Sequence, residues 1–176
     1  CCATKGGGYL SHLIRRATID DVEQISNLYV TSLKNAFNGI FSEGYLSKLT
    51  PESTYKQWKR NIENPNNLVF VVEDNQEIVG MIVGAFVDEE GETSNQGNIL
   101  AVYIKPDYKR IGYGKKLVAA LFDEFKKRNI TKCFANVFKN NHNRGFFEQV
   151  GGVLVDERPV DEAHVISIFV YSWDKI

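Results

Sequence analysis

The stretch Gly97-Asn-Ile-Leu-Ala-Val-Tyr-Ile-Lys-Pro-Asp-Tyr-Lys-Arg-Ile-Gly-Tyr-Gly-Lys-Lys-Leu-Val-Ala-Ala-Leu-Phe-Asp-Glu-Phe125 predicts a strand, a loop and a helix in succession. Residues 99–104 are apolar, β-branched or aromatic, as expected of a buried strand. Pro106 and Asp107 end this strand. Apolar side chains then recur at the spacing of an α-helix, at Leu117, Val118, Leu121, Phe122 and Phe125. The chain is therefore expected to be organised around this strand–loop–helix unit.

The loop of this unit contains Lys109, Arg110, Gly112 and Gly114. Glycine lets the backbone turn tightly and approach a ligand closely. A helix start offers free N–H groups and a partial positive charge, which suit a phosphate or pyrophosphate. Two common phosphate loops do not fit, because the dinucleotide fingerprint requires glycine where Leu117 stands and the Walker loop requires glycine at Lys109. A plain turn, with glycines needed only for packing, is the alternative.

A third pattern fits. The run Lys109-Arg110-Ile111-Gly112-Tyr113-Gly114 resembles the acyl-CoA loop Gln/Arg-x-x-Gly-x-Gly/Ala of the GNAT family of N-acetyltransferases, with Lys109 where Gln or Arg is usual. The preceding residues 102–106 are similar to the strand end that this family places before the loop. The resemblance implies that backbone N–H groups cradle the CoA pyrophosphate. It also implies an α/β (α+β) fold with a mixed, mostly antiparallel central sheet, splayed between its fourth and fifth strands and flanked by helices.

A second stretch resembles the family pattern Asn-x-x-Ala-x-x-Phe-Tyr-Glu-x-x-Gly-Phe. Asn140, Phe146, Glu148 and Gly151 match it, whereas Asn143 replaces Ala and Gly152 replaces Phe. By resemblance, Asn140 would hydrogen-bond the pantetheine arm of CoA. Phe147 stands where the family usually has a Tyr that protonates the departing CoA thiolate, and a phenyl ring has no proton to give.

The usual general base is also missing, because Asn98 occupies the position near the start of the fourth strand where many relatives have Glu. The catalytic candidates that we retain are Tyr103 and His164; His142 and the acidic residues 88–92 were considered as further bases. Each has an ordinary alternative role, as a packing residue or as a solvated surface residue. Acidic residues near the site would favour a cationic acceptor amine.

The resemblance implies acetyl-CoA as co-substrate and no metal. The residues expected to bind the cofactor are Val102, Tyr103, Ile104, Lys109, Arg110, Ile111, Gly112, Tyr113, Gly114, Lys115, Asn140, Asn143 and Phe147.

Patterning along the chain predicts the element order β-α-α-β-β-β-α-β-α-β-β in one N-acetyltransferase domain spanning residues 9–176. We expect residues 1–8 to be a flexible tail or an artificial extension. Residues 37–49 are expected to be a loop with at most one helical turn, and residues 88–96 a polar loop. A hairpin is expected to join strands at 68–72 and 78–87.

The composition of the chain argues against several classes of function. The net charge of −1 gives no drive towards nucleic acid or anionic membranes. The longest nearly apolar run, residues 78–87, is too short to cross a bilayer. The three cysteines form no disulfide framework and no zinc spacing, which favours a reducing, cytoplasmic compartment.

The leading hypothesis is an N-acetyltransferase that transfers acetyl from acetyl-CoA to a primary amine of a small molecule or peptide, by direct attack in a ternary complex. The alternative is a catalytically weak CoA-binding sensor or regulatory module of the same fold, which the residues Asn98 and Phe147 favour. We expect no nucleic-acid and no membrane partner, and leave open a homodimer.

Overall fold

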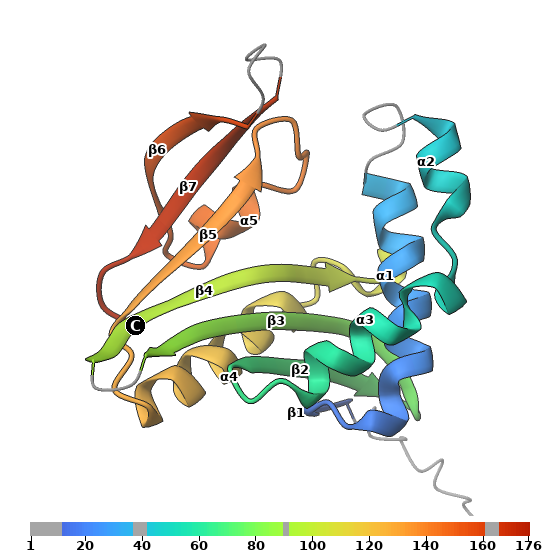
Figure 1. Cartoon of the computed structure of the whole chain (residues 1–176), viewed down its shortest axis with the longest axis horizontal. Helices are drawn as coiled ribbons and strands as arrows, with labels where there is room; N and C mark the ends of the chain where they lie inside the picture. Colours follow the sequence, from blue (N-terminus) through green and yellow to red (C-terminus); the bar gives the residue numbers. More distant parts are fainter. Residues whose placement is uncertain (1–11, 37–41, 90–91, 161–165) are drawn as a thin grey trace, which may run out of the picture.

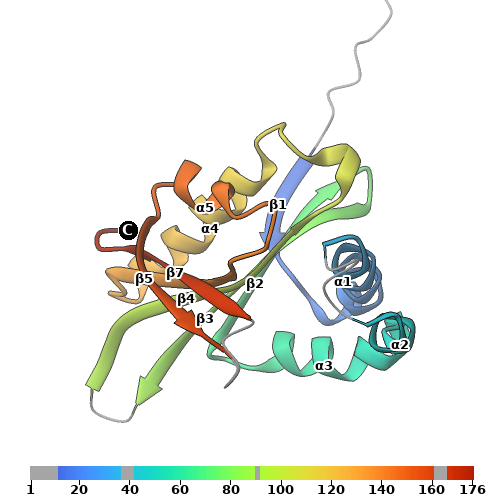
Figure 2. The same ribbon diagram turned by 90° about the horizontal axis from the view of Figure 1, so that it is seen from above.

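In a computed structural model, the chain forms one open sheet with helices on both faces (Figures 1 and 2). The structure describes residues 12–36, 42–89, 92–160 and 166–176. Within these ranges the sheet has seven strands in the order β1-β2-β3-β4-β5-β7-β6, and all pairs are antiparallel except β4–β5. The predicted fold class and element order are confirmed, with one short helix, α2, added in the region expected to be a loop.

The elements have these bounds: β1 His12–Arg16, η1 Ile19–Asp21, α1 Val22–Ala36, α2 Glu43–Lys48, α3 Pro51–Glu63, β2 Asn67–Asp74, β3 Glu77–Glu89, β4 Glu92–Ile104, η2 Pro106–Tyr108, α4 Tyr113–Lys127, β5 Lys132–Phe138, α5 Gly145–Gln149, β6 Val153–Pro159 and β7 Ser167–Trp173.

The prediction of a polar loop at residues 88–96 is wrong. Strand β3 continues to Glu89 and β4 begins at Glu92, with Asp88 opposite Thr93 across the hairpin. Strand pairing is made by backbone groups, so it extends beyond the last apolar side chains. In Figure 1 this end of the hairpin lies at the left, and helices α1 and α2 lie at the right, near the other end of β4.

The sheet opens between β4 and β5. Their parallel pairing runs only from Gln96 opposite Lys132 to Ile99 opposite Ala135. Beyond that point β4 runs on to Ile104 and β5 to Phe138, and the two ribbons diverge (Figure 1). The predicted splay between the fourth and fifth strands is therefore present, and it begins directly after Ile99.

A β-bulge at Leu100 coincides with this separation. On β3, Gly84 faces Ile99 and Val83 faces Ala101, so Leu100 is an extra residue on β4. A bulge bends its strand and shifts the alternation of side chains. As a result Ile99 packs in the core beneath α4, whereas Tyr103, four residues on, packs in the second core, which lies against α1 and α3.

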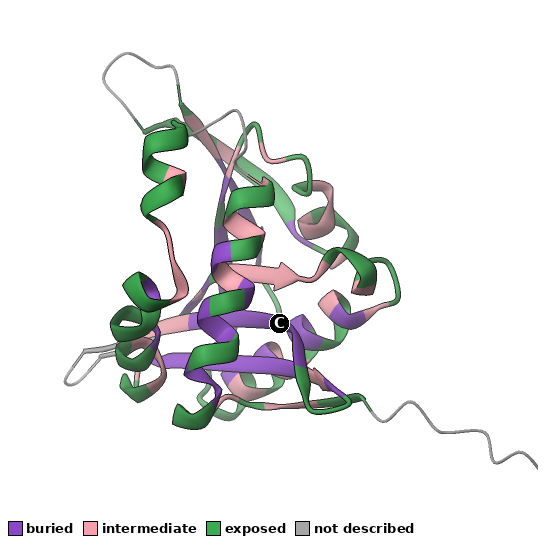
Figure 3. Cartoon of the chain, turned by 90° about the vertical axis from the view of Figure 1, so that its right-hand side faces the viewer, coloured by how far each residue is buried: buried purple, intermediate pink, exposed green. Residues whose placement is uncertain are grey.

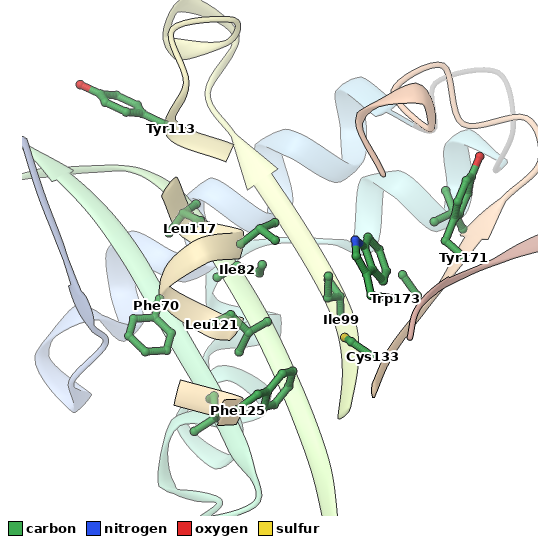
Figure 4. Packing of buried hydrophobic residues seen from close by; sticks show 14 of the residues in the cluster. Phe70, Ile82, Ile99, Tyr113, Leu117, Leu121, Phe125, Cys133, Tyr171 and Trp173 are labelled. Carbon is green, nitrogen blue, oxygen red and sulfur yellow. The ribbon is translucent and has the colours of Figure 1, made fainter. Parts of the chain in front are cut away.

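Helix α4 is held against the sheet by one apolar face. Leu117, Leu121 and Phe125 are fully buried and point towards the strands (Figure 4). Figure 3 shows the same division across the molecule, with buried residues on the strands and on the sheet-facing sides of the helices. Two glycines of the sheet permit this close approach, since a Cβ at Gly97 would lie 2.6 Å from Phe125 Cε2 and one at Gly84 would overlap Leu121.

We expect Gly97→Ala to lower the free energy of unfolding by about 1–3 kcal/mol, because the added methyl group overpacks the core against the Phe125 ring. Denaturant unfolding measures this loss. Gly44→Ala is the control, since a Cβ at that helical position meets nothing within 4 Å; it should raise stability by about 0.5–1 kcal/mol. Equal stability of Gly97→Ala and the wild type would contradict this description of the packing.

The start of α1 is fixed by an ion-pair cluster. The Arg15 guanidinium on β1 donates to both carboxylate oxygens of Asp21, at 2.7 and 2.9 Å, and to Glu73 of β2 at 2.9 Å. Asp21 also accepts from the Thr18 backbone amide at 2.7 Å. The hydrogen bond from Arg15, reinforced by Thr18, holds the pKa of Asp21 below its usual value. The cluster ties the N-terminal end of α1 to the sheet.

Asp21→Asn should destabilise the fold by about 2 kcal/mol at neutral pH, since it removes a charge-assisted hydrogen-bond acceptor. Because the folded-state pKa of Asp21 is lowered, its contribution is complete above the unfolded pKa of about 3.9 and is lost as pH falls through the folded value. The stability difference between wild type and variant should therefore shrink below about pH 4. The exposed neighbour Asp20 supplies the control, Asp20→Asn. A difference that is independent of pH would rule out this ionic contribution.

Candidate active site

The loop before α4 adopts the conformation of an anion site. Gly112 is the N-cap residue of α4, with φ of +95°, and no side chain caps the helix. The first backbone N–H groups of the helix therefore point outwards without an intrahelical partner. Arg110 also has a positive φ, of +64°, which is uncommon for a residue other than glycine. The exposed side chains of Lys109, Arg110 and Lys115 add positive charge around these amides.

The two glycines of this loop serve different purposes. A Cβ at Gly112 would meet nothing within 4 Å, so this position needs glycine for its backbone conformation and leaves open space above the helix start. A Cβ at Gly114 would lie 2.7 Å from the Phe146 ring, so this glycine lets α5 pack against α4. The packing alternative raised from the sequence thus applies to Gly114 and does not account for Gly112.

The Tyr113 ring packs against other aromatic rings beside the loop. It is 7% exposed, stacks on Tyr108 with 6.3 Å between ring centroids, and lies 5.3 Å from the His12 ring. Lys116 Nζ lies 2.6 Å from His12 Nε2. Because the Tyr113 ring is buried, the group of this residue that can reach a ligand is its backbone amide. The Ile111 side chain, in contrast, is 58% exposed.

The opening beside β4 exposes backbone groups. Lys105 donates its N–H to Val79 of β3 at 2.9 Å. Because successive residues of a strand direct their N–H and C=O groups to opposite edges, Val102 and Ile104 direct theirs towards the opening, and Tyr103 directs its own towards β3. Of the three residues predicted to bind the cofactor here, Val102 and Ile104 offer backbone N–H donors to a ligand in the opening, and Tyr103 offers its side chain.

A cavity of about 240 Å³ lies at the mouth of this opening, on the face of the sheet covered by α1 and α2. Figure 2 shows these helices on the opposite side of the sheet from α4 and α5. Its lining includes one residue from each diverging strand, Tyr103 of β4 and Phe138 of β5. The lining residues are Tyr29, Leu33, Tyr45, Leu46, Leu49, Tyr103 and Phe138.

The phenol of Tyr103 can donate a proton or a hydrogen bond but cannot serve as a base near neutral pH. Burial raises the pKa of Tyr103 well above its usual value, with a smaller contribution from Tyr29. The ring packs edge-on to Tyr29, with centroids 5.6 Å apart. Tyr29 in turn packs edge-on to the buried Trp58 at 5.2 Å. Trp58 belongs to the core behind the cavity.

That Asn98 and Phe147 occupy the two positions where proton-transfer groups are usual stays a prediction. The Phe147 ring stacks on Tyr171 of β7 with 5.6 Å between centroids. Tyr171 is fully buried and donates its hydroxyl to Glu148 at 3.2 Å. Asn98 is partly buried in β4, between Ala85 and Phe134 of the neighbouring strands. Neither Asn98 nor Phe147 can exchange a proton near neutral pH.

The remaining predicted residues lie at the turn after β5 or outside the described ranges. Asn140 and Asn143 are exposed between β5 and α5, and the Asn143 amide donates to Asn141 at 2.9 Å. His142, in the same turn, is exposed. His164 lies outside the described residues, and its catalytic role stays a prediction.

Sequence reasoning missed most of the cavity. Tyr29 and Leu33 stand on α1 at the helical spacing typical of core residues, but both line the cavity. The apolar Phe138 at the end of β5 could have indicated this cavity, because the alternation of side chains along a strand places it on the face of the sheet opposite Val137. Glu89 ends β3 and Glu92 begins β4, so both lie at the other end of this hairpin, more than about 30 Å from Tyr103 along the strand.

Among the described residues, no three His, Cys, Asp or Glu side chains gather as metal ligands. A search of the same residues finds no helix with the length and apolarity needed to cross a membrane.

Comparison with known proteins gives consistent results. The sequence profile of the acetyltransferase (GNAT) family matches residues 30–152. A spermidine N(1)-acetyltransferase of Thermoplasma acidophilum is 27% identical over 151 residues, which cover 82% of this chain and 89% of that protein.

Solved structures share the fold. The PaiA N-acetyltransferase of Thermoplasma acidophilum, in complex with coenzyme A, superposes with a TM-score of 0.74 at 24% identity, covering 95% of this chain and all of that one. A ribosomal-protein-alanine N-acetyltransferase from Brucella melitensis gives a TM-score of 0.71 at 19% identity, covering 92% and 99% of the two chains.

The open space above Gly112 makes that position a test of cofactor binding. We expect Gly112→Asp to weaken coenzyme A binding at least tenfold, because a carboxylate would stand over the amides that would hold the pyrophosphate. Gly112→Asn is the matched control: it has nearly the same shape, tolerates a positive φ and carries no charge. Calorimetry that finds equal affinities for the two folded variants would reject a pyrophosphate site at this loop.

Proposed function

Because this chain belongs to the acetyltransferase (GNAT) family and is an acetyl-CoA-dependent acyltransferase, we propose that its acceptor is a primary amine of a small molecule or peptide, attacked directly in a ternary complex. The observation that carries the proposal is the opening between β4 and β5. On one side of the sheet lies the uncapped start of α4, and on the other the cavity at the mouth of the opening. A thioester that enters through the opening would meet an amine in the cavity.

In the proposed reaction the neutral amine nitrogen attacks the thioester carbonyl, the C–S bond breaks, and the products are the amide and the CoA thiolate. The ammonium must first lose a proton to solvent, and the thiolate takes one up afterwards. In this proposal the Val102 and Ile104 amides stabilise the oxyanion, and the loop at 109–115 binds the pyrophosphate. Positioning by these backbone groups would supply most of the rate acceleration.

A CoA-binding sensor of the same fold is the second candidate, and Asn98 and Phe147 favour it. The test is release of free thiol from acetyl-CoA in the presence of a broad panel of primary amines, with calorimetry of coenzyme A binding alongside. Turnover with any amine supports the enzyme. Binding of coenzyme A without turnover of any amine would overturn the enzymatic proposal in favour of the sensor.

If the enzyme works without a protein acid, Phe147→Tyr should change turnover less than about tenfold, although a well-placed general acid contributes about 10²–10⁴-fold where it limits the rate. Amine deprotonation and attack should limit the rate instead, so turnover should rise between about pH 7 and 9, towards an alkylamine pKa near 10.4. Phe147→Leu controls for altered packing against Tyr171. A hundredfold gain in Phe147→Tyr at neutral pH would show that thiolate protonation is the step that the wild type lacks.

A further inference from the structure

The cavity beside β4 and β5 is lined by aromatic and aliphatic side chains, with polar atoms among them. Among the described residues that line it, each side chain is a leucine, a phenylalanine or a tyrosine, and the polar side-chain atoms are the phenol oxygens of Tyr29, Tyr45 and Tyr103. Glu43, the acid of helix α2, is exposed and does not line it. Removing a charged ammonium from water without a counter-charge is costly, whereas apolar and aromatic groups gain from such surroundings.

The back wall of the cavity is built from fixed rings. Tyr29 is held edge-on by Trp58 at 5.2 Å and by Tyr103 at 5.6 Å, and Trp58 is 2% exposed. Edge-to-face contact at these distances is the preferred geometry of aromatic rings, and it holds the Tyr29 ring in place. The front wall comes from α2, which buries none of its residues and whose Tyr45 is 54% exposed.

The volume fits an aryl ring with a short side chain. An apolar cavity of about 150 Å³ admits benzene. The cavity here measures about 240 Å³, which leaves room for a two-carbon linker and an amine directed at the opening between Tyr103 and Phe138. A polyamine of similar length would place a second ammonium among leucine and aromatic side chains.

We propose that the acceptor is an arylalkyl monoamine, bound with its ring against Tyr29 and its amine at the opening beside Tyr103, in preference to a polyamine. This inference rests on the proposed acetyl transfer to a primary amine. The proposed preference for an arylalkyl monoamine distinguishes this chain from the relative whose name specifies spermidine. The residues that set the preference are those of the cavity wall, and Leu33 on α1 is a wall position where a charge can be introduced near solvent, because it is only partly buried.

The test compares kcat/KM for phenethylamine, hexylamine and spermidine at saturating acetyl-CoA. Phenethylamine should exceed spermidine at least tenfold, and hexylamine should fall between them. Leu33→Glu places a carboxylate in the wall, and Leu33→Gln has the same shape without charge. Relative to Leu33→Gln, Leu33→Glu should raise kcat/KM for spermidine at least fivefold and lower it for phenethylamine, and added salt should reduce the gain.

The outcomes separate the two proposals. Acetylation of amines with spermidine preferred by the wild type would overturn the acceptor class and leave the enzymatic function standing. Equal spermidine activity of Leu33→Glu and Leu33→Gln would overturn the assignment of this cavity. Turnover of no amine would overturn both. Calorimetry of phenethylamine with the CoA-loaded protein provides a readout besides turnover: weaker binding to Leu33→Glu than to Leu33→Gln is expected, and equal binding would count against the cavity.

Discussion

The β-bulge at Leu100 is the constraint on which the arrangement of the site depends. One extra residue on β4 coincides with the last pair between β4 and β5, and it reverses the alternation of the side chains that follow. Without the bulge, Tyr103 would share the face of Ile99, beneath α4. With it, Tyr103 reaches the cavity, and the Val102 and Ile104 backbone groups border the opening. A single local irregularity thus creates both the passage through the sheet and one of its walls.

Each face of the sheet has its own core, and under the proposed function each face serves one ligand. On one face, Leu121 and Phe125 pack α4 closely onto the strands at positions where Gly84 and Gly97 leave room, and the start of this helix is therefore fixed relative to β4. On the other face, α1 and α3 pack on a separate cluster that includes Trp58. The anion site at α4 is consequently anchored to the first core and the cavity wall to the second, and the opening is where they meet.

The strand–loop–helix unit could be predicted from the sequence because its signals are local. The apolar run of β4, the helical spacing from Leu117 to Phe125 and the loop glycines each act over a few residues. The bulge could not be predicted, since Leu100 continues the apolar run and only the register against β3 distinguishes it. The hairpin beyond Phe86 was missed because backbone pairing continues where apolar patterning stops. The cavity was missed because Tyr29 and Leu33 have the same spacing as core residues and differ only in extending past the sheet.

The proposed acceptor cavity also bears on the absence of a general base at Asn98. Burial in surroundings of low polarity disfavours the charged form of an amine and lowers its pKa. An ammonium that enters the cavity would therefore lose its proton to solvent more readily than it does in water, and the neutral nucleophile would be populated nearer to neutral pH. The phenol of Tyr103, protonated because burial raises its pKa, can donate a hydrogen bond at the same opening. Under the proposed arrangement, desolvation by the cavity wall replaces part of the contribution of a general base, and this explains how Asn98 and Phe147 can be compatible with catalysis.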